Sequence, residues 1–476
     1  MGMRISLLFP ALVGLVTGIS AGAAAGAAAG APIFARNWPA WRGPLATGAS
    51  LEAQPPLQWA ENRNVKWKVA VPGRGTASPV VWEDLVFLLT AIPITNATTA
   101  SPSATTPANP SSATDGRSAA GNASRRGGPA GPGGAMTEMP TTPQKITVLA
   151  YDRGTGKIRW QKSPRTQLPH EGHHRDHGYA SASPVTDGEV LVASFGSFGV
   201  YGYDLRGNLL WEKDLGRMQT RNGFGEGSSP ALDGESVVVL WDHEGEDFIV
   251  SLDKRTGKER WRQRRTEPTG WCTPLILGYG GQKQVVVNGT NKARSYDLAT
   301  GKLLWECAGQ TANAIPSAVA DAERVYIMSG FRGANCQAIT LGRTGDLTGT
   351  DAIAWSLNKG TPYVPSPLLS NGRLYFYAGN NPQLSSYDAR TGKVDLDTVR
   401  LAGMNGVYAS PVAAAGRVYL TGRDGVTLVI KDGPGLELLA TNKLDENFDA
   451  TPALAGTDLF LRGQEALYCL STAARK

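Results

Sequence analysis

The chain has few cysteines, and their spacing limits what they can do. Among its 476 residues are 4 cysteines, and none is adjacent to another or part of a CxxC motif. Two interpretations stay open: buried free thiols, or disulfides drawn from three possible pairings. The four residues are Cys272, Cys307, Cys336 and Cys469.

Long apolar stretches are missing after the N-terminus, and charged residues make up only 18% of the chain. No later stretch approaches the roughly 20 apolar residues that a membrane-spanning helix needs, so we expect no membrane span. The formal charge is +6, but the most basic cluster, 260–265, is predicted as a strand end and a loop. We interpret the charge as a mild surface bias and expect no nucleic-acid partner.

Residues 1–35 have the features of an export signal peptide. Arg4 precedes an apolar run over 5–16, and an Ala/Gly tract follows through Ala31. Small residues of this kind suit a signal peptidase, which would cut near Ala31 or Ala35. No cysteine lies near that cut, so a lipid anchor is not expected. We predict a periplasmic or secreted protein.

Glycine and proline are abundant, and they mark an internal repeat. The sequence has 58 glycines and 30 prolines. A Ser-Pro or Thr-Pro step recurs, and after the first copy its spacing is about 41 to 49 residues, the range of a four-stranded propeller blade. With the degenerate Pro316-Ser317-Ala318 there are eight copies, the others being Ser78-Pro79, Ser183-Pro184, Ser229-Pro230, Thr273-Pro274, Ser366-Pro367, Ser410-Pro411 and Thr451-Pro452.

One complete repeat runs from Gly227 to Trp261. Its short apolar runs are separated by an Asp-Gly turn, a polar loop over 241–247 and a glycine-centred turn over 253–258. Four short strands with tight turns form one antiparallel blade. In the last turn, glycine supplies a positive φ, aspartate caps the turn, and the following tryptophan docks on the neighbouring blade. We predict an all-β fold, an eight-bladed β-propeller of four-stranded antiparallel blades.

The two ends of the chain are predicted to close the ring. Only six residues follow Leu470, so the last repeat lacks an outer strand. The stretch 65–71 alternates like a strand and carries Trp67 where a blade-ending tryptophan would stand. We predict that this N-terminal strand pairs with the last blade and hides both free edges. The propeller then spans 36–476, and an Ala/Ser/Thr/Pro/Gly-rich insertion over 93–143, expected to be disordered, interrupts the first blade.

The turn motif YDLATGKLLW at 296–305 and its copies resemble the tryptophan-docking turn of the PQQ-binding-like (quinoprotein-type) β-propeller repeat family. The resemblance covers roughly 38–470. The segment WPAWRGP at 38–44 is also similar to the WPxWRGP opening of an exported bacterial branch of that family. The resemblance implies the propeller fold and leaves the function open, because such propellers include quinone-dependent alcohol dehydrogenases and an outer-membrane assembly lipoprotein.

The sequence departs from both of these family functions. The resemblance implies PQQ with calcium held against a disulfide between adjacent cysteines, and this chain has no adjacent pair. We do not place the calcium ligands or the catalytic carboxylate of those dehydrogenases residue by residue onto this sequence. The assembly lipoprotein carries an N-terminal cysteine, which is also missing.

The histidines gather in two loops that are predicted to face the same mouth of the ring. Four lie in PHEGHHRDHGYASASP before the second blade, and the fifth lies in WDHEGED of the third blade. The first loop matches HExxH, but Pro169 and Gly172 oppose the helix that a zinc protease needs, so we do not expect one. A metal site of two histidines and an acid would suit Zn or Mn. The alternative is a set of polar loop residues bonded to backbone and water.

We assign no catalytic and no cofactor-binding residue. The candidate ligand-binding or metal-binding residues are His170, His173, His174, Asp176, His177, Arg221, Asn222, Glu226, Asp242, His243 and Glu244. The sequence favours an exported monomer, a non-catalytic scaffold or binding module that meets a protein partner or a small polar ligand with its loop face. The alternative is a metal- or PQQ-dependent oxidoreductase-like enzyme with a histidine/carboxylate site at the ring mouth.

Overall fold

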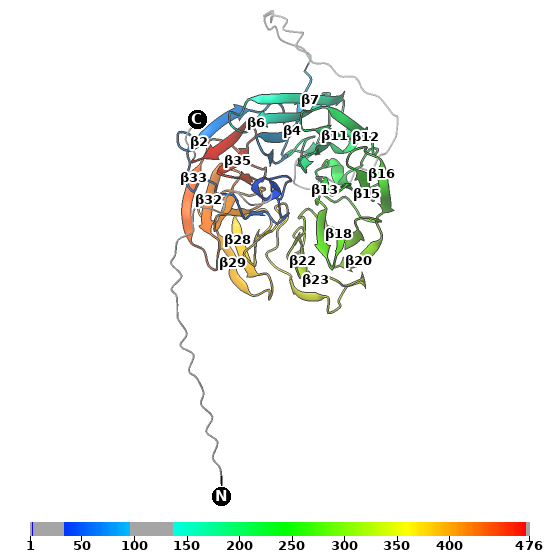
Figure 1. Ribbon diagram of the computed structural model, residues 1–476, viewed down its shortest axis with the longest axis vertical. Coiled ribbons are helices and arrows are strands. Elements are labelled where there is room, and N and C mark those ends of the chain that lie inside the picture. Colours follow the sequence, from blue (N-terminus) through cyan, green and yellow to red (C-terminus); the bar gives the residue numbers. More distant parts are fainter. Residues whose placement is uncertain (1, 3–32, 96–136, 473–476) are drawn as a thin grey trace, which may run out of the picture.

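The structure is a computed structural model that describes residues 2, 33–95 and 137–472. Most of the predicted signal peptide (1–35) and of the predicted insertion (93–143) therefore lies outside the described residues. The described chain forms a ring of eight sheets (Figure 1), which confirms the predicted all-β, eight-bladed propeller. Its only helices within these ranges are the short 3-10 turns η2 (Ile33–Arg36), η3 (Gly196–Phe198) and η4 (Arg221–Gly223).

Each of the first four blades begins at the ring axis and ends at the rim (Figure 1). Blade 1 contains β3 (Val80–Trp82), β4 (Leu85–Pro93), β6 (Gln144–Asp152) and β7 (Ile158–Gln167), and blade 2 contains β9 (Val185–Thr186), β10 (Val190–Ser194), β11 (Val200–Asp204) and β12 (Leu209–Lys213). Blade 3 contains β13 (Ala231–Asp233), β14 (Ser236–Trp241), β15 (Phe248–Asp253) and β16 (Glu259–Arg264), and blade 4 contains β17 (Leu275–Tyr279), β18 (Gln282–Val287), β19 (Lys292–Asp297) and β20 (Leu303–Ala308), with β24 (Gly345–Asp346) added at its outer edge.

The other four blades repeat the pattern. Blade 5 contains β21 (Val319–Ala320), β22 (Arg324–Ser329), β23 (Asn335–Thr340) and β25 (Ile353–Leu357), and blade 6 contains β26 (Leu368–Ser370), β27 (Arg373–Tyr377), β28 (Gln383–Asp388) and β29 (Val394–Arg400). Blade 7 contains β30 (Val412–Ala414), β31 (Arg417–Thr421), β32 (Val426–Lys431) and β33 (Leu438–Lys443), and blade 8 contains β34 (Ala453–Ala455), β35 (Asp458–Arg462), β36 (Ala466–Ser471) and β2 (Val65–Ala70).

The N-terminal segment closes the ring as predicted. Strand β2 is the outer strand of blade 8 and pairs antiparallel with β36, with Trp67 opposite Cys469. A second N-terminal strand, β1 (Ala49–Ser50), was not predicted from the sequence, and it runs parallel to β30 at the inner edge of blade 7. Two residues of the predicted insertion also form a strand, because β5 (Thr137–Glu138) pairs with β8 (His173–His174).

Both faces of a blade are buried, and strand β14 shows why its sequence is continuously apolar. Val237 and Val239 pack toward blade 2 in one buried cluster. Val238 and Leu240 pack toward blade 4 in another. Because successive side chains point to opposite faces, an interior strand of this ring has no polar side. Each such side chain contributes about 1.5–3 kcal/mol by burial.

The tryptophan that ends a blade docks on the glycine turn of the next blade, as predicted. Trp211 donates through Nε1 to the carbonyl oxygen of Lys254 at 2.7 Å, and a Cβ on Gly257 would lie only 2.7 Å from its ring. Gly257 has φ +66°, a conformation that favours glycine. The same two contacts join Trp67 to Arg153 and Gly156, Trp160 to Leu205 and Gly207, Trp261 to Leu298 and Gly301, and Trp355 to Ala389 and Gly392.

Blade 4 departs from this docking rule, because the turn that follows it is degenerate. Trp305 donates through Nε1 to Gln284 of its own blade at 3.2 Å. In its place Tyr279 packs against Gly342 in the turn of blade 5. The sequence of this turn, LGRTG at 341–345, departs from YDLATGK at 296–302, but it does not predict the exchange of partners.

The recurring Ser-Pro steps form a chain of hydrogen bonds around the ring axis. In each link, the backbone N–H of one anchor donates to the side-chain hydroxyl of the anchor in the next blade, for example from Ser366 to Ser410 at 2.9 Å. Buried N–H groups need such partners, so the hydroxyl explains why serine or threonine recurs there. The links run in the order Ser78, Ser183, Ser229, Thr273, Ser317, Ser366, Ser410 and Thr451.

Candidate functional site

A loop rich in histidine crosses the mouth of the ring. This histidine loop (169–178) enters blade 2, and the N–H of His174 donates to the carbonyl oxygen of Phe224, ahead of blade 3, at 2.9 Å. At its other end, Asp176 accepts hydrogen bonds from Tyr408 at 2.9 Å and from Arg423 of blade 7 at 3.2 Å. The loop is therefore held from both sides of the mouth.

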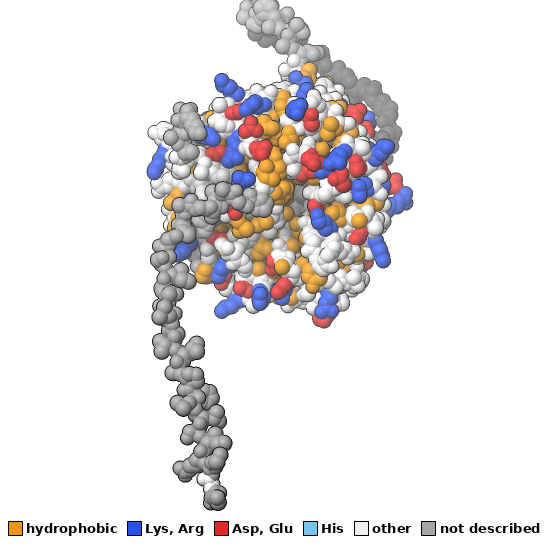
Figure 2. Space-filling view, viewed as in Figure 1, with side chains coloured by type: hydrophobic (Ala, Val, Ile, Leu, Met, Phe, Trp, Pro, Cys, Tyr) orange, Lys and Arg blue, Asp and Glu red, His pale blue; other side chains and the backbone are white. Residues whose placement is uncertain are grey.

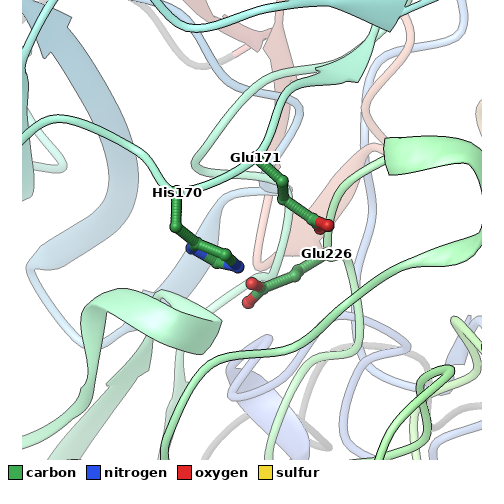
Figure 3. Close-up of side chains that lie close together, drawn as sticks. All are labelled: His170, Glu171 and Glu226. Atoms are coloured by element: carbon green, nitrogen blue, oxygen red, sulfur yellow. The ribbon is translucent and has the colours of Figure 1, made fainter. Parts of the chain in front are cut away.

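Two carboxylates and one imidazole converge beneath this loop (Figure 3). The three side chains are His170, Glu171 and Glu226, and one potential ligand atom from each lies within 4.8 Å of the other two. His170 donates through Nε2 to the carbonyl oxygen of Met218 at 2.6 Å. Of these three residues, His170 and Glu226 were candidates from the sequence.

Both carboxylates are oriented by a backbone N–H and a hydroxyl group. Glu226 accepts from the N–H of Ser197 at 2.7 Å and from its hydroxyl at 2.5 Å. Glu171 accepts from the N–H of Thr220 at 3.0 Å and from its hydroxyl at 2.6 Å. A Cβ at Gly196 would clash with the Glu226 carboxylate, so this position needs glycine. Such bonds hold the carboxylates in place before any ligand arrives.

The protonation of Glu226 is set by its enclosure. Burial raises its pKa to about 7, against the hydrogen bonds from Ser197, and the nearby Glu171 carboxylate raises it further. Ionisation of both carboxyl groups is unfavourable when they lie close together, because like charges repel more strongly away from water. At neutral pH, Glu226 is therefore divided between its protonated and ionised forms.

A cavity surrounds this carboxylate pair. It holds roughly 700 Å³ of empty space, part of it open to solvent, between the mouth loops of blades 2, 3 and 4. Aromatic side chains form much of its wall, and Trp271 is fixed by a hydrogen bond from Nε1 to the carbonyl oxygen of Gly225 at 2.8 Å. The aromatic wall residues are Tyr179, Phe195, Phe198, Trp241 and Trp271. Its largely apolar wall, with a few polar groups converging on it, is typical of a small-molecule site.

The other three histidines of the loop hold the loop itself. His173 donates through Nδ1 to the carbonyl oxygen of His174 at 2.8 Å, so Nδ1 carries the proton. His174 accepts from the N–H of Asp176 at 3.2 Å, and burial lowers its pKa. His177 donates from Nε2 to Phe224 at 2.5 Å, and burial lowers its pKa to about 4, so it is neutral.

The candidates of blade 3 lie beside the cavity, but most are already engaged. His243 accepts at Nδ1 from the N–H of Gln219 at 3.1 Å and bonds through Nε2 to the carbonyl oxygen of Glu246 at 3.1 Å. Asp242 lines the cavity and forms a fully buried ion pair with Arg265 at 2.7 Å. These contacts stabilise the loop and leave His243 no free ring nitrogen for a metal ion.

The remaining candidates also have local roles. Glu244 accepts from the hydroxyl and the N–H of Thr269, at 2.9 and 3.1 Å. The N–H of Arg221 donates to the hydroxyl of Thr269 at 2.8 Å. Asn222 has φ 54° within η4, a conformation that asparagine tolerates. None of the three lines the cavity.

Sequence reasoning missed Glu171 as a site residue, although it lies inside the HExxH match. The HExxH match did not predict a zinc site because Pro169 and Gly172 oppose a helix, and for this reason its glutamate was not named as a candidate. The residues that orient the two carboxylates belong to no motif. Thr220 lies 49 residues from Glu171, and Ser197 lies 29 residues from Glu226. Only the packing of neighbouring blades brings them together.

The four cysteines decide between the two interpretations left open by the sequence. All four lie in the described part of the chain, and all are free and buried. Burial raises the pKa of Cys272 to about 12, where its thiol donates to the carbonyl oxygen of Asn288 at 3.3 Å. They do not form the disulfide between adjacent cysteines that the family resemblance implies for PQQ.

The fold places the protein among ring-shaped repeat proteins, and the cavity described above lies among its mouth loops. Residues 144–344 match the family model described as outer membrane protein assembly factor BamB. The chain thus has a PQQ-like β-propeller, as its docking turns indicated. The match does not include the WPAWRGP segment at 38–44.

Solved structures of two alcohol dehydrogenases show the same fold. A quinohemoprotein alcohol dehydrogenase from Comamonas testosteroni superposes with a TM-score of 0.59 at 10% identity, covering 93% of this chain and 82% of that chain. One from Pseudomonas putida HK5 gives 0.57 at 10% identity, covering 93% and 81%. BamB from Moraxella catarrhalis gives 0.40 at 16% identity, covering 61% and 96%. The likeness to the two alcohol dehydrogenases concerns the fold alone.

No curated protein matches the chain. No helix in the described ranges is long and apolar enough to cross a membrane. On the surface, acidic and basic side chains are intermingled over the visible face (Figure 2).

Proposed function

We propose that the protein is an exported, monomeric binding module that holds a small polar ligand in the cavity at its loop face. The observation that carries this proposal is the pair of enclosed carboxylates, Glu171 and Glu226, each aligned by an N–H and a hydroxyl donor. Export is supported by the sequence of residues 1–35. The likeness to alcohol dehydrogenases supports no activity here.

The chemistry of the cavity favours a ligand with hydroxyl groups and one apolar face, such as a sugar. Glu171 offers free acceptor positions on its carboxylate, because each oxygen has two lone pairs. Glu226, with a pKa of about 7, both accepts and donates hydrogen bonds near neutral pH. The ring of Trp271 supplies a flat apolar surface on which a sugar ring packs.

Ligand binding is tested by titrating the purified protein with a panel of monosaccharides and amino sugars. The signal is intrinsic tryptophan fluorescence, because Trp241 and Trp271 line the cavity. We expect a saturable change for at least one compound. Glu171→Gln and Glu226→Gln should each weaken binding about tenfold or more, because each removes a charge-assisted hydrogen bond of about 1.5–3 kcal/mol.

The matched control is Glu246→Gln. Glu246 lies near the site in the polar loop of blade 3, but its side chain is 71% exposed and pairs with Arg264. This variant should bind like the parent protein. Equal loss in all three variants, or no saturable response to any sugar, would contradict the proposal.

A second candidate function is binding of a divalent cation by the same residues. It is favoured by the spacing of His170, Glu171 and Glu226, whose ligand atoms lie within 4.8 Å of one another. Two carboxylates suit calcium or manganese, and an imidazole suits manganese or zinc. His170 would bind through a ring nitrogen that is free of Met218, or it would release that carbonyl.

This alternative is distinguished by metal analysis after dialysis and by thermal unfolding with Ca²⁺, Mn²⁺ or Zn²⁺. A bound cation would raise the melting temperature in a saturable way, since it binds the folded state. Glu226→Gln should abolish that rise and His170→Ala should reduce it. Unchanged melting temperatures with all three cations would eliminate the metal site and leave the organic ligand.

A further inference from the structure

A second cavity lies at the junction of blades 8 and 1, across the histidine loop from the carboxylate cavity. It holds roughly 400 Å³ of empty space, part of it open to solvent. Its walls are 74–76 ahead of blade 1, 449–450 and 462–464 of blade 8, and Asp176 and His177 of the histidine loop. Neither the family resemblance nor the proposed function accounts for it.

An incompletely bonded arginine lines this cavity. Arg462 ends strand β35 and is only 1% exposed. Its Nη1 donates to the carbonyl oxygen of Leu89, in β4 of blade 1, at 2.6 Å. Its Nε and Nη2 have no hydrogen-bond partner among the described residues. These two atoms form one edge of the guanidinium fork, the edge that binds a carboxylate or phosphate with two parallel bonds.

The charge of Arg462 is also unmatched. Burial lowers the pKa of its guanidinium to about 10, so it remains charged at neutral pH. A buried cation that lacks some of its acceptors destabilises the folded state, and an anion that binds to it reduces this cost. The nearby hydroxyl of Tyr151 also has no partner within the described chain.

The surrounding groups leave the cavity positive. Asp449 accepts from Nε of Arg423 at 2.6 Å, and Asp176 accepts from Nη2 of the same arginine at 3.2 Å. Both acids of the cavity are thus paired with Arg423. Arg74 lies exposed at the entrance of the cavity and adds another positive charge. His177 is neutral because burial lowers its pKa to about 4.

Arg42 shows what a buried arginine with a purely structural role looks like in this protein. It is 5% exposed, and its two terminal nitrogens donate to the carbonyl oxygens of Pro411, Thr47 and Pro367. Only its Nε lacks a partner among the described residues. Arg42 lines neither cavity. Arg462 differs in having two donors on one edge without a partner among the described residues, and in lining a cavity.

We propose that the cavity at the junction of blades 8 and 1 binds a small oxyanion, a carboxylate or a phosphate group, on the Nε and Nη2 edge of Arg462. Arg74 supplies a second positive charge at the entrance. The anion completes the hydrogen bonding of Arg462 and links blade 8 to blade 1, where the N-terminal strand closes the ring. This site is separate from the carboxylate cavity and does not depend on its ligand.

The test is thermal unfolding and calorimetric titration of the full chain with sodium phosphate, sodium sulfate and sodium acetate. Sodium chloride at the same ionic strength is the reference, because phosphate and sulfate stabilise most proteins without a site. We expect saturable stabilisation by at least one oxyanion. Phosphate above acetate indicates a phosphate group as the natural ligand, and the reverse order indicates a carboxylate.

Two variants test the roles of Arg462 and Arg74. Arg462→Lys keeps the charge and removes the fork, and should weaken anion binding by at least tenfold. Arg74→Ala removes only an exposed side chain, since Arg74 holds Ala91 through backbone bonds, and should weaken binding several-fold. If Arg462→Lys does not fold, Arg74→Ala still tests the proposal.

The control is Glu226→Gln in the carboxylate cavity, which should leave anion binding unchanged. This control separates the anion site from the proposed ligand site. A response that does not saturate, or one that is the same in the parent protein and in Arg74→Ala, overturns the proposal.

Discussion

At the rim of the propeller, five tryptophans dock in the same way, whereas at the mouth each loop makes contacts of its own. Trp211 on Gly257 repeats, in bond and in ring packing, what Trp261 does on Gly301. At the mouth, Glu226 is held by Ser197, while Arg462 reaches Leu89 of another blade. The same repeat therefore has one end that is uniform and one that is not.

This difference separates assembly from recognition within each blade. Every docking turn forms the same contact between one blade and the next, so the same residues recur in it. The mouth loops are free of that demand, and their polar residues meet in combinations that occur once. We therefore expect rim substitutions to change stability and mouth substitutions to change binding or pH dependence.

The largest effect is expected for Trp211→Ala at the rim. Loss of the buried ring and of its hydrogen bond to Lys254 should lower the free energy of unfolding by about 3–5 kcal/mol. Urea denaturation measures this change. The matched mouth variant Trp271→Ala should cost less stability and should alter ligand binding. Equal destabilisation by the two variants would break the distinction between rim and mouth.

The next effect concerns Glu226 at the mouth. Its pKa is raised to about 7, so the stability that it contributes is fully present below its unfolded pKa of about 4.5 and is lost as the pH rises through 7. Glu226→Gln should remove this loss, worth up to about 3 kcal/mol, from the pH profile of unfolding.

The comparison is made between parent and variant at several pH values from 4 to 8. His177 acts with the opposite sign, because its lowered pKa destabilises the folded state as the pH falls from 6.5 towards 4. That part of the profile should persist in Glu226→Gln. A variant profile parallel to that of the parent would show that Glu226 titrates normally.

Gly257→Ala is expected to have a smaller effect than loss of the tryptophan. A Cβ there meets the ring of Trp211 and also imposes a strained positive φ, which together should cost about 2 kcal/mol. Gly234→Ala is the control, since φ is +56° but nothing lies within 4 Å of the added Cβ. Thermal unfolding should show Gly234→Ala to be the milder change; equal effects would mean that ring contact adds nothing to backbone strain.

The smallest effect is expected for Ser410→Ala in the hydrogen-bond chain at the axis. The N–H of Ser366 would lose its acceptor in a buried position, which should cost about 1 kcal/mol. Ser410→Thr keeps the hydroxyl, as Thr451 does in blade 8, and should restore the stability measured by chemical denaturation. No rescue by threonine would argue that volume, not the hydroxyl, matters at this position.

Much of the fold was predictable because the repeat is written into local patterns. The glycine turns and their tryptophans predicted the blades, and Trp67 indicated the closing strand, which pairs with β36 as predicted. The parallel strand β1 was not predictable, because two residues carry no periodicity. Trp305 shows the limit of the repeat, since its partner depends on a degenerate turn in the next blade.

The candidate site was predictable only in part. The sequence pointed to the histidine loop and to Glu226, and the structure brings His170 and Glu226 together. It could not show that His243 is already bonded at both ring nitrogens, because its partners are backbone groups. It also gave no sign that Arg462 would be buried beside a cavity.

The sequence by itself determined the number of blades, the docking turns and the ring closure, because each depends on short motifs that act on neighbouring elements. Only the tertiary structure decided which mouth residues meet. Arg462 and Leu89 are 373 positions apart, and Glu226 and Ser197 belong to different blades. Ring closure brings the first pair together and the packing of neighbouring blades brings the second pair together. Burial then sets the charge states of these groups, so neither their contacts nor their charges follow from a motif.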